Sequence, residues 1–545
     1  MSERNRGADA VMRQLAARGV DTVFTLSGNH IMSLFDAALE TNITLVHTRH
    51  EGAAVHMADA YGRLTGKPGV AMVTGGPGHA NACGALFTAL GADSPMVLLS
   101  GHAPTSQAGW AAFQELDQAA MAAPVTKASW TAAPGADLAS EVDRALDLAA
   151  AGRPGPVHLS LPSDLLDGEA GTSATASATG ETPTDAPRYD DAEGWAVAHR
   201  WLAEAAKPVI VAGPVFARAE VGDSLRQAAS LIGVPVVVQE SPRGLNDPSL
   251  GAFADVLAEA DVIILANKAC DFTVRFAEPP FVRDDAKIIA LSGDTDQLEL
   301  ARARKGANAV LIASDAAATV AGLTRLEGQA RAVDAAWRTR VADAIAYRPD
   351  AWSGMQEAKP GMLHPLEMCA AIKPILDAAP DTVLIMDGGE IGQWAQATLT
   401  ARRRITNSVT GSIGASLPFA IGARYVESDA PVITIMGDGT VGFHLAEFET
   451  AVREKTPFIC IVGNDANWNA EYQIQVNDYG AARAKGCELL PSAYDEVCAA
   501  LGGFGARVTT AAELTEALDA AVASGKPACI NVMLDGRGAP KIRLP

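Results

Sequence analysis

The sequence lacks three features that mark membrane and secreted proteins. None of its apolar stretches approaches the ~20 residues that a membrane-spanning helix needs. Its charged, helical N-terminus, MSERNRGADAVMRQLAARG, has no apolar core of a signal peptide. Its seven cysteines form no CxxC pair, and several lie inside apolar runs, as expected for core residues in a reducing compartment. We therefore expect a cytoplasmic protein that does not insert into a membrane.

A basic segment is also missing. Lys and Arg number 43 against 64 Asp and Glu, which gives a formal net charge of −21, and no basic block offsets it. A phosphate backbone or an acidic lipid surface would be repelled, so we expect no nucleic acid and no membrane among the partners. A chain of 545 residues, 48% of them hydrophobic, is too long for one core and suggests about three globular domains.

Short apolar runs alternate with helical patterns in three regions: 1–166, 192–350 and 360–545. Residues 167–191 are rich in Ser, Thr, Ala, Gly and Pro without periodicity, which predicts a linker. The alternation predicts an α/β fold with a doubly wound parallel sheet in each region. The expected strands lie near 23–24, 44–47, 70–74, 96–100, 157–161, 208–212, 234–238, 262–266, 288–291, 383–386, 432–436, 458–462 and 528–533.

The stretch 431–469 carries the most specific chemistry. A predicted strand ends at a Gly-Asp-Gly turn, a helix follows at about 443–454, and a second strand ends before Asp465. The carboxyl ends of parallel strands share one edge of a sheet, so Asp438 and Asp465 should converge there. Two hard oxygen ligands beside a Gly-rich turn and a helix N-terminus suit Mg²⁺ bound to a diphosphate. The alternative is an ordinary acidic loop after a strand.

This stretch resembles the motif of thiamine-diphosphate enzymes, in which Gly-Asp-Gly is followed at a fixed distance by Asn-Asn. Here the pair is Asn464-Asp465, and 27 positions separate Asp438 from Asp465. The resemblance implies that Asp438 and Asp465 give side-chain oxygens to Mg²⁺ and that Asn467 gives a main-chain carbonyl. Asp465 departs from the family's usual Asn and adds a negative charge.

The resemblance covers nearly the whole chain and implies its organisation. Residues 1–166 would be a pyrimidine-binding domain, 192–350 a middle domain, and 360–545 a diphosphate-binding domain. The family holds its cofactor between the first domain of one subunit and the third of another, so we expect at least a homodimer, and a homotetramer as the full assembly.

A second motif, HTRHEGAAVHMADAYGR at 47–63, places Glu51 at the start of a helix. In the family a carboxylate beside the aminopyrimidine ring protonates N1′, so that the neighbouring amino group can remove the C2 proton of the thiazolium ring. The resemblance implies this role for Glu51. The alternative for Glu51 alone is an ordinary first-turn glutamate.

Further positions resemble particular members of the family. His30 in Gly28-Asn-His30, and Gln114 in the FQELDQ segment, resemble the His and Gln with which benzaldehyde lyase handles the donor's protons. The alternative for His30 is a loop histidine. The Ile413 position is where the family places an apolar residue under the cofactor, although plain core is also open. The predicted cofactor-binding residues are Glu51, Gly389, Glu390, Ile413, Gly437, Asp438, Gly439, Thr440, Asp465, Asn467 and Trp468.

At two positions the sequence departs from residues that are usual in the family, one relevant to the reaction and one to nucleotide binding. Acetolactate synthases usually carry Lys where Ser163 stands, and Ser292 replaces the first Asp through which relatives hold FAD or ADP. The middle region has no GxGxxG, yet residues 271–280 resemble the nucleotide-binding domain of 2-hydroxyacyl-CoA lyases. Bound ADP or FAD therefore stays open.

We expect a thiamine-diphosphate- and Mg²⁺-dependent carbon–carbon lyase or carboligase, with Glu51, His30 and Gln114 as catalytic residues. It would decarboxylate a 2-oxo acid or release an aldehyde, and an acceptor carbonyl would capture the remainder. One alternative is a 2-hydroxyacyl-CoA lyase or oxalyl-CoA decarboxylase-like enzyme with ADP in the middle domain. Another is a non-catalytic cofactor-binding or regulatory subunit.

Overall fold

A computed structural model describes residues 5–171, 191–328, 333–354, 358–427 and 429–545. Its strands form three parallel β-sheets with flanking helices, which confirms the predicted α/β fold. The chain divides into two compact units. The first comprises residues 1–184, 417–429 and 444–458, and the second comprises the rest. Within these described ranges, no helix combines the length and the apolar character needed to cross a bilayer.

The sheet of the first unit has the strand order β2-β1-β3-β4-β6-β5, and all its pairs are parallel. The chain starts at β1, moves out to β2 and returns to β3, so the connections after β1 and β3 leave in opposite directions, which is where such sheets bind ligands. The strands are β1 Thr22–Leu26, β2 Thr44–His47, β3 Gly69–Val73, β4 Met96–His102, β5 Ala128–Thr131 and β6 Pro156–Pro162.

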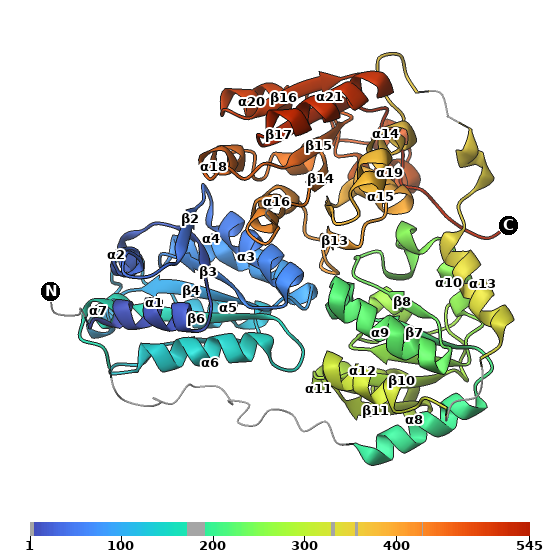
Figure 1. The fold of residues 1–545 in the computed structure, drawn as a ribbon, viewed down its shortest axis with the longest axis horizontal. Helices are drawn as coiled ribbons and strands as arrows, with labels where there is room; N and C mark the ends of the chain where they lie inside the picture. The colour runs from blue at the N-terminus through green and yellow to red at the C-terminus, as the bar shows by residue number, and fades with distance from the viewer. Residues whose placement is uncertain (1–4, 172–190, 329–332, 355–357, 428) are drawn as a thin grey trace. The chain divides into compact units, whose positions relative to one another are not determined.

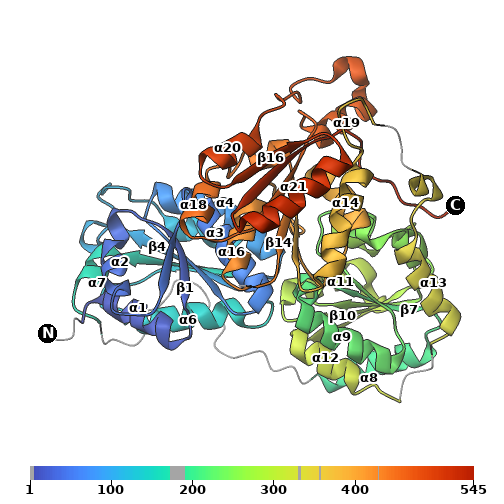
Figure 2. The same cartoon turned by 45° about the horizontal axis from the view of Figure 1, so that its top comes forward.

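Helices cover both faces of this sheet. Figures 1 and 2 show α1 and α6 on one face and α3 and α4 on the other. Small residues let α3 lie close to its neighbours: a Cβ at Gly62 would come within 2.3 Å of the carbonyl oxygen of Pro95. The helices of this unit are α1 Gly7–Ala17, α2 Met32–Ala38, α3 Glu51–Thr65, α4 Pro77–Gly91, α5 Gln118–Ala122, α6 Leu138–Ala150, α7 Ser163–Asp167, most of α16 Ser416–Arg424, and α18 Glu447–Arg453.

The second unit contains two parallel sheets. One has the order β11-β10-β9-β7-β8 and the other β13-β12-β14-β15-β17-β16. The strands of the five-stranded sheet are β7 Pro208–Ala212, β8 Val236–Val238, β9 Val262–Ala266, β10 Lys287–Ser292 and β11 Ala309–Ala313. Those of the six-stranded sheet are β12 Val383–Met386, β13 Arg403–Thr406, β14 Val432–Gly437, β15 Ile459–Asn464, β16 Phe504–Val508 and β17 Ala528–Met533.

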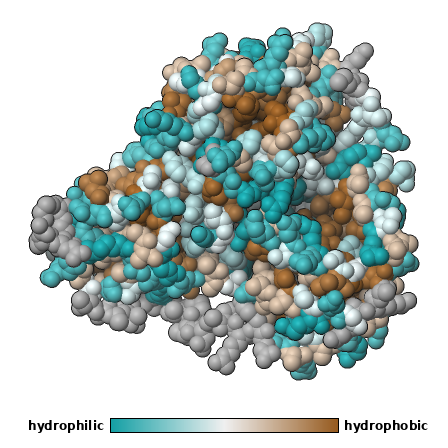
Figure 3. Space-filling model, in the orientation of Figure 1, coloured by the Kyte–Doolittle hydropathy of each residue, from teal (hydrophilic) through white to brown (hydrophobic). Residues whose placement is uncertain are grey.

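Helices pack on each of these two sheets. In the five-stranded part α9 contacts α12 and α10 contacts α13, and in the six-stranded part α14 contacts α15 and α21. They are α8 Ala192–Glu204, α9 Ala219–Ile232, α10 Phe253–Leu257, α11 Thr295–Lys305, α12 Ala316–Thr324, α13 Ala335–Ala346, α14 Pro365–Ala378, α15 Gly389–Thr398, α17 Asp438–Val441, α19 Asn469–Tyr479, α20 Tyr494–Ala500 and α21 Ala511–Ser524. On the face drawn in Figure 3, hydrophilic and hydrophobic residues are interspersed.

The structure differs from the sequence predictions at the sheet edges. Four strands, β5, β11, β13 and β16, were not predicted, and each lies at the edge of its sheet. β5, β13 and β16 are partly exposed and contain polar or charged residues, so they form no continuous apolar run. β11 has the apolar sequence AVLIA, and this run was missed. The predicted helix at 443–454 is shorter, because α18 begins at Glu447 and the separate short helix α17 precedes it. Residues 172–190 of the predicted linker lie outside the described residues.

The six-stranded sheet carries polar residues directly after the carboxyl ends of its strands. Its central strands β12, β14 and β15 are buried along almost their whole length, as expected of strands covered on both faces. Asp387 follows β12, Asp438 follows β14, Asp465 follows β15 and Asp535 follows β17. Four carboxylates therefore stand beyond the carboxyl ends of neighbouring parallel strands.

Candidate active site

A cavity of about 250 Å³ lies at this edge of the six-stranded sheet. Segments that follow β12, β13, β14, β15 and β17 form its walls, together with residues 241–243 that follow β8. All ten predicted cofactor-binding residues of the third region line it, although they come from four separate stretches of sequence. They are Gly389, Glu390, Ile413, Gly437, Asp438, Gly439, Thr440, Asp465, Asn467 and Trp468.

Asp438 and Asp465 are two carboxylates that line the same cavity. Asp438 is buried, with 2% of its surface exposed, and burial raises its pKa to about 6. Burial, together with the negative charge of Asp438, raises the pKa of Asp465 to about 7. Two carboxylates that resist ionisation because they are buried side by side would both be stabilised by a bound cation.

The turn that carries Asp438 is closely packed. A Cβ at Gly439 would come within 2.6 Å of the ring of Trp468, so only glycine fits under this indole. The hydroxyl of Thr440 donates to the carbonyl oxygen of Gly437 at 3.1 Å. The backbone N–H of Trp468 donates to the carbonyl oxygen of Cys487 at 2.7 Å, which fixes the loop after Asp465. Both loops are therefore held in place by contacts within the protein.

Asp387 joins two further loops of the cavity. Its fully buried carboxylate accepts hydrogen bonds from the backbone N–H groups of Gly388 at 2.7 Å, Gly414 at 3.1 Å and Ser416 at 3.3 Å. Burial raises the pKa of Asp387 above its ordinary value, and these hydrogen bonds oppose the rise. Gly388 and Ile413 line the cavity, and Gly414 directly follows Ile413, so these hydrogen bonds fix both loops beside the cavity.

The donor set fits a hard divalent cation with a diphosphate. One oxygen of Asp438 and the side-chain oxygen of Asn467 are buried and have no hydrogen-bond partner among the described residues. No cluster of three or more His, Cys, Asp or Glu side chains suited to a metal occurs in that part of the chain. A metal here would complete its coordination with a backbone carbonyl and with ligand oxygens, which is the usual arrangement for Mg²⁺.

Glu51 lies in the first unit, at the first position of α3. Its side chain is 9% exposed, and one carboxylate oxygen accepts a hydrogen bond from the amide of Asn81 at 3.0 Å. The ring of His50 caps the helix by accepting the N–H of Gly52 at 3.0 Å. Glycine at position 78 leaves room beside the other oxygen, because a Cβ there would lie 3.4 Å from it.

His30 and Gln114 lie together in the same unit. The ring of His30 stacks on Phe113 with centroids 6.1 Å apart, and its Nδ1 is 3.3 Å from the hydroxyl of Thr74. Burial lowers the pKa of His30, so the imidazole is neutral near pH 7. The side-chain oxygen of Gln114 is buried and has no hydrogen-bond partner among the described residues, and its backbone has a positive φ of 58°. A strained backbone and an unsatisfied polar atom are typical of ligand-binding positions.

Comparison with known proteins decides the family. Residues 5–121 match the N-terminal TPP binding domain of thiamine pyrophosphate enzymes, and residues 387–532 match the C-terminal TPP binding domain. The chain is 31% identical to the acetolactate synthase large subunit IlvG of Mycobacterium tuberculosis, over 96% of this chain and 95% of that protein.

The chain is a thiamine pyrophosphate enzyme.

Other relatives carry two different names. The 2-hydroxyacyl-CoA lyase 2 of Homo sapiens is 30% identical, over 92% of this chain and 84% of that protein. The acetolactate synthase large subunit of Parasynechococcus marenigrum is 29% identical, over 96% of this chain and 87% of that protein. Thiamine diphosphate, another name for thiamine pyrophosphate, is thus the cofactor of this enzyme's family, and the relatives divide between two activities.

Some residues that line the cavity of this thiamine pyrophosphate enzyme were not predicted. Arg243 comes from the five-stranded part of the unit, Asn407 follows the unpredicted edge strand β13, and Arg537 follows β17. For Arg537 a signal was available, because it lies four residues beyond a predicted strand at the ligand-binding edge. Arg243 and Asn407 carried no such signal.

Proposed function

We propose that this enzyme is a thiamine-diphosphate- and Mg²⁺-dependent carbon–carbon lyase or carboligase. It would act on a 2-oxo acid or an aldehyde and pass the remainder to an acceptor carbonyl. The observation that supports this best is the convergence of the ten predicted cofactor residues on one cavity with a buried, unpartnered carboxylate oxygen.

The residues of this cavity would bind the cofactor and its metal. Asp438 and Asp465 would give carboxylate oxygens to Mg²⁺, and Asn467 its main-chain carbonyl, while Ile413 would support the rings. Bound thiamine diphosphate supplies a carbon nucleophile for a substrate carbonyl and an acceptor for the electrons of the bond that breaks. The protein's own contribution is then to hold this group, to exclude water and to move protons.

Two residues of the first unit would handle protons. Asn81 donates a hydrogen bond to one oxygen of Glu51, so the other oxygen can hold or release a proton. His30 is neutral near pH 7 because burial lowers its pKa, so Nε2 can accept or give the proton of a donor hydroxyl while Nδ1 faces Thr74. Gln114, whose buried side-chain oxygen has no partner among the described residues, would accept a hydrogen bond from the same substrate.

A substrate panel tests the proposal. Purified protein with thiamine diphosphate and Mg²⁺ would be assayed with pyruvate and other 2-oxo acids, with benzoin, and with 2-hydroxyacyl-CoA thioesters. We expect CO₂ or aldehyde release from at least one 2-oxo acid or benzoin, and its loss when EDTA removes the metal. Turnover that survives both EDTA and omission of the cofactor would contradict the proposal.

A second candidate activity, cleavage of a 2-hydroxyacyl-CoA, is favoured by a second cavity. This cavity has a volume of about 660 Å³ and shares Arg243 and Glu390 with the first. Arg275, Lys541 and Arg543 also line it, so four cations face one carboxylate in a chain whose net charge is −21. Arg543 pairs with Asp255 at 2.8 Å, whereas no ion pair among the described residues uses the other three. Such a surface suits the phosphates of coenzyme A.

The two candidates differ in what the second cavity does. If it binds the nucleotide of a thioester, Arg275→Met and Lys541→Met should raise KM for a 2-hydroxyacyl-CoA on the order of tenfold, because each removes a charged hydrogen-bond donor. KM for a substrate without phosphate should not change. Arg304→Met is the matched control, because Arg304 pairs with Glu278 and does not line the cavity. Unchanged KM for the thioester in both variants would exclude this role.

The remaining proposals concern assembly and the middle sheet. We propose that the enzyme works in the cytoplasm as at least a homodimer, with a homotetramer as the full assembly.

Ser292 at the end of β10 donates to Gln297 at 2.9 Å, so an ADP or FAD here would need other contacts than the family's first Asp. Release of a nucleotide on denaturing the purified protein, detected by absorbance and mass spectrometry, would show which one is bound.

A further inference from the structure

The loop that leads from β2 into α3 ends at Glu51, and each of its residues is held. The carbonyl oxygen of His47 accepts a hydrogen bond from Arg453. The hydroxyl of Thr48 lies 3.3 Å from the carbonyl oxygen of Thr25 and 3.0 Å from that of His50. The backbone N–H of Arg49 donates to a carboxylate, and His50 caps the helix. The four residues before Glu51 therefore have little freedom.

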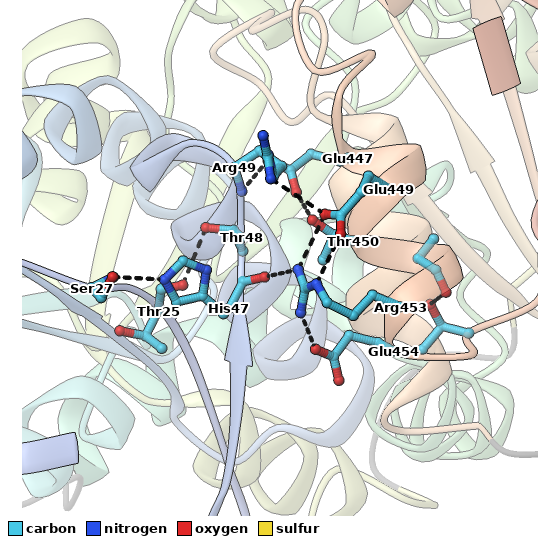
Figure 4. A network of polar contacts seen from close by, with 12 residues as sticks. Thr25, Ser27, His47, Thr48, Arg49, Glu447, Glu449, Thr450, Arg453 and Glu454 are labelled. Atoms are coloured by element: carbon cyan, nitrogen blue, oxygen red, sulfur yellow. Dashed lines mark hydrogen bonds and ion pairs between the residues drawn. The ribbon is translucent and has the colours of Figure 1, made fainter. Parts of the chain in front are cut away.

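Glu447 holds this loop from a distant part of the sequence. Its carboxylate is 1% exposed, and its Oε1 accepts the backbone N–H of Arg49 at 3.0 Å. Its other oxygen accepts the hydroxyl of Thr450 at 2.6 Å, which fixes the side chain on α18. Figure 4 shows this carboxylate pointing from α18 to the backbone at the end of β2. Burial of a carboxylate costs free energy, and the two hydrogen bonds of Glu447 offset part of this cost.

Arg453 holds the other end of the loop from the last position of α18, six residues after Glu447. Its guanidinium donates to the carbonyl oxygen of His47 and to Glu449 at 3.1 Å, and it also pairs with Glu454. The two acidic partners fix the guanidinium in its orientation. Arg453 and Glu447 thus contact the backbone of the loop rather than its side chains, which makes the contact depend on the loop's position and not on its sequence.

We infer that Glu447 and Arg453 are positioning residues that fix the carboxylate of Glu51 by holding the backbone of residues 47–49. This inference rests on the proposed catalytic role of Glu51. Neither residue contacts Glu51 itself in the described structure; they act through the loop. Small displacements of a catalytic group are costly, because a misplacement of about 1 Å can reduce a rate on the order of a hundredfold.

The test uses variants that remove or keep each contact. Glu447→Met and Arg453→Met should lower kcat roughly ten- to hundredfold, with KM and the Kd for thiamine diphosphate nearly unchanged, since neither residue binds ligand. Glu447→Gln keeps an acceptor for the N–H of Arg49, and Arg453→Lys keeps a donor for His47, so each should recover part of the rate. Independently of activity, amide hydrogen exchange in the peptide containing residues 47–50 should accelerate in both Met variants.

A matched control separates this role from general stability. Arg18, like Arg453, has a side chain that is 37% exposed and pairs with two carboxylates, Asp143 and Asp147, but it contacts no residue of the loop. Arg18→Met should therefore leave both kcat and exchange of the loop unchanged. If the buried Glu447→Met protein does not fold, the half-exposed Arg453→Met still decides the question.

A double-variant cycle decides whether the effect passes through Glu51. In a Glu51→Gln background, Arg453→Met should cause no further loss of kcat, because there is no carboxylate left to position. Full additivity of the two losses, or wild-type kcat in Arg453→Met despite faster exchange, would overturn the inference. Wild-type kcat in Glu51→Gln alone would instead refute the proposed function of Glu51, so the two failures are distinguishable.

Discussion

Glu51 has one carboxylate oxygen bound to Asn81 and the other beside Gly78, where the lack of a side chain leaves space. This asymmetry suits a group that must keep its orientation and still exchange a proton. The carboxylate oxygen that accepts from Asn81 can accept whether or not the other oxygen carries a proton. The hydrogen bond from Asn81 is therefore kept in both protonation states of Glu51.

Replacement of this carboxyl by an amide should stop catalysis and spare binding. In Glu51→Gln the side chain keeps its size and its contact with Asn81, but it cannot hold an acidic proton. We expect kcat to fall about 10²- to 10⁴-fold, the usual range for loss of general acid–base catalysis. Exchange of the C2 proton of bound thiamine diphosphate, followed by NMR in D₂O, should slow to a similar degree, while calorimetry shows a Kd within a few-fold of wild type. The exposed Glu40→Gln is the control, and wild-type C2 exchange in Glu51→Gln would falsify the assignment.

Asp465 is the residue at which the proposed metal site departs from the Asn that is usual in the family. Its charge adds to that of Asp438, and the raised pKa of about 7 reflects both burial and this repulsion. In a protein without metal this repulsion is destabilising, and in the proposed site Asp465 would give a bound metal an additional negative ligand.

Asp465→Asn should therefore weaken metal binding and stabilise the metal-free protein. Loss of one ligand charge should raise the Kd for Mg²⁺ roughly tenfold, about 1.4 kcal/mol. The thermal midpoint without Mg²⁺ should rise above that of wild type, and the increase on adding Mg²⁺ should be smaller. Asp478→Asn, the same change at an exposed position of α19, should alter neither quantity. An unchanged Mg²⁺ dependence would show that Asp465 is not a ligand.

At this scale the sequence predicts the residues that come directly after a recognisable strand. Asp438, Asp465 and Glu390 could be found because each comes soon after an apolar run that ends at the ligand-binding edge. Arg243 could not be found in this way, because it reaches the cavity from another sheet through packing that no local pattern encodes. Asn407 was missed because the strand before it was missed.

At the scale of elements, all central strands were predicted, whereas four of the six edge strands, β5, β11, β13 and β16, were not. β9 and β14 are buried on both faces, so their sequences are continuous apolar runs. β13, with the sequence RRIT, has two arginines of which Arg404 pairs with Glu240, and β16 is mostly half-buried. In β13 and β16, charged side chains on an edge strand interrupt the apolar run by which strands are predicted.

A group of histidines joins α3 to the segment before α18. The ring of His444 lies 5.6 Å from that of His50 and 5.7 Å from that of His56 between centroids. Burial is the main cause that lowers the pKa of both His56 and His444 to about 3, and the charge of Arg63 adds to the effect at His56. Both rings are therefore neutral in the folded protein near pH 7.

This burial predicts a loss of stability in mild acid. The unfolded chain protonates these histidines near pH 6.5 and the folded chain does not, so their contribution is present above pH 6.5 and is lost as the pH falls toward 3. His444→Phe, which keeps a ring of similar size, should lose about 2 kcal/mol less than wild type between pH 7 and pH 5. Urea denaturation at the two pH values measures the difference. His199→Phe, at a histidine of α8 in the other unit, is the control, and equal pH slopes in all three proteins would contradict the expectation.

At the scale of the whole molecule, the proposed catalytic residues and the proposed cofactor residues belong to different compact units. Glu51, His30 and Gln114 are in the first unit, and Asp438 and Asp465 are in the second. The family resemblance implies that a complete site takes them from two copies of the chain, and this can be tested without knowledge of the assembly's structure.

Mixing two inactive variants should restore activity if each site is shared. In a heterodimer of Glu51→Gln and Asp438→Asn chains, one site carries both changes and the other carries none. Random mixing by unfolding and refolding should therefore recover about a quarter of wild-type activity in a symmetric dimer. Each variant refolded alone should remain inactive. If Glu51 and Asp438 of the same chain formed the site, the mixture would have no intact site and would stay inactive.

The hydrogen bond between the N–H of Arg49 and the carboxylate of Glu447 joins positions 398 residues apart in the sequence. A recombination event or a designed hybrid that takes residues 1–166 from one relative and the rest from another would take these two partners from different parents. The same holds for His47 and Arg453. Because both contacts are made to backbone atoms of residues 47–49, such a hybrid should keep its activity when the parent that supplies residues 444–453 has Glu at position 447 and Arg at position 453. An insertion between Gly442 and Glu447 should be as damaging as one beside Glu51.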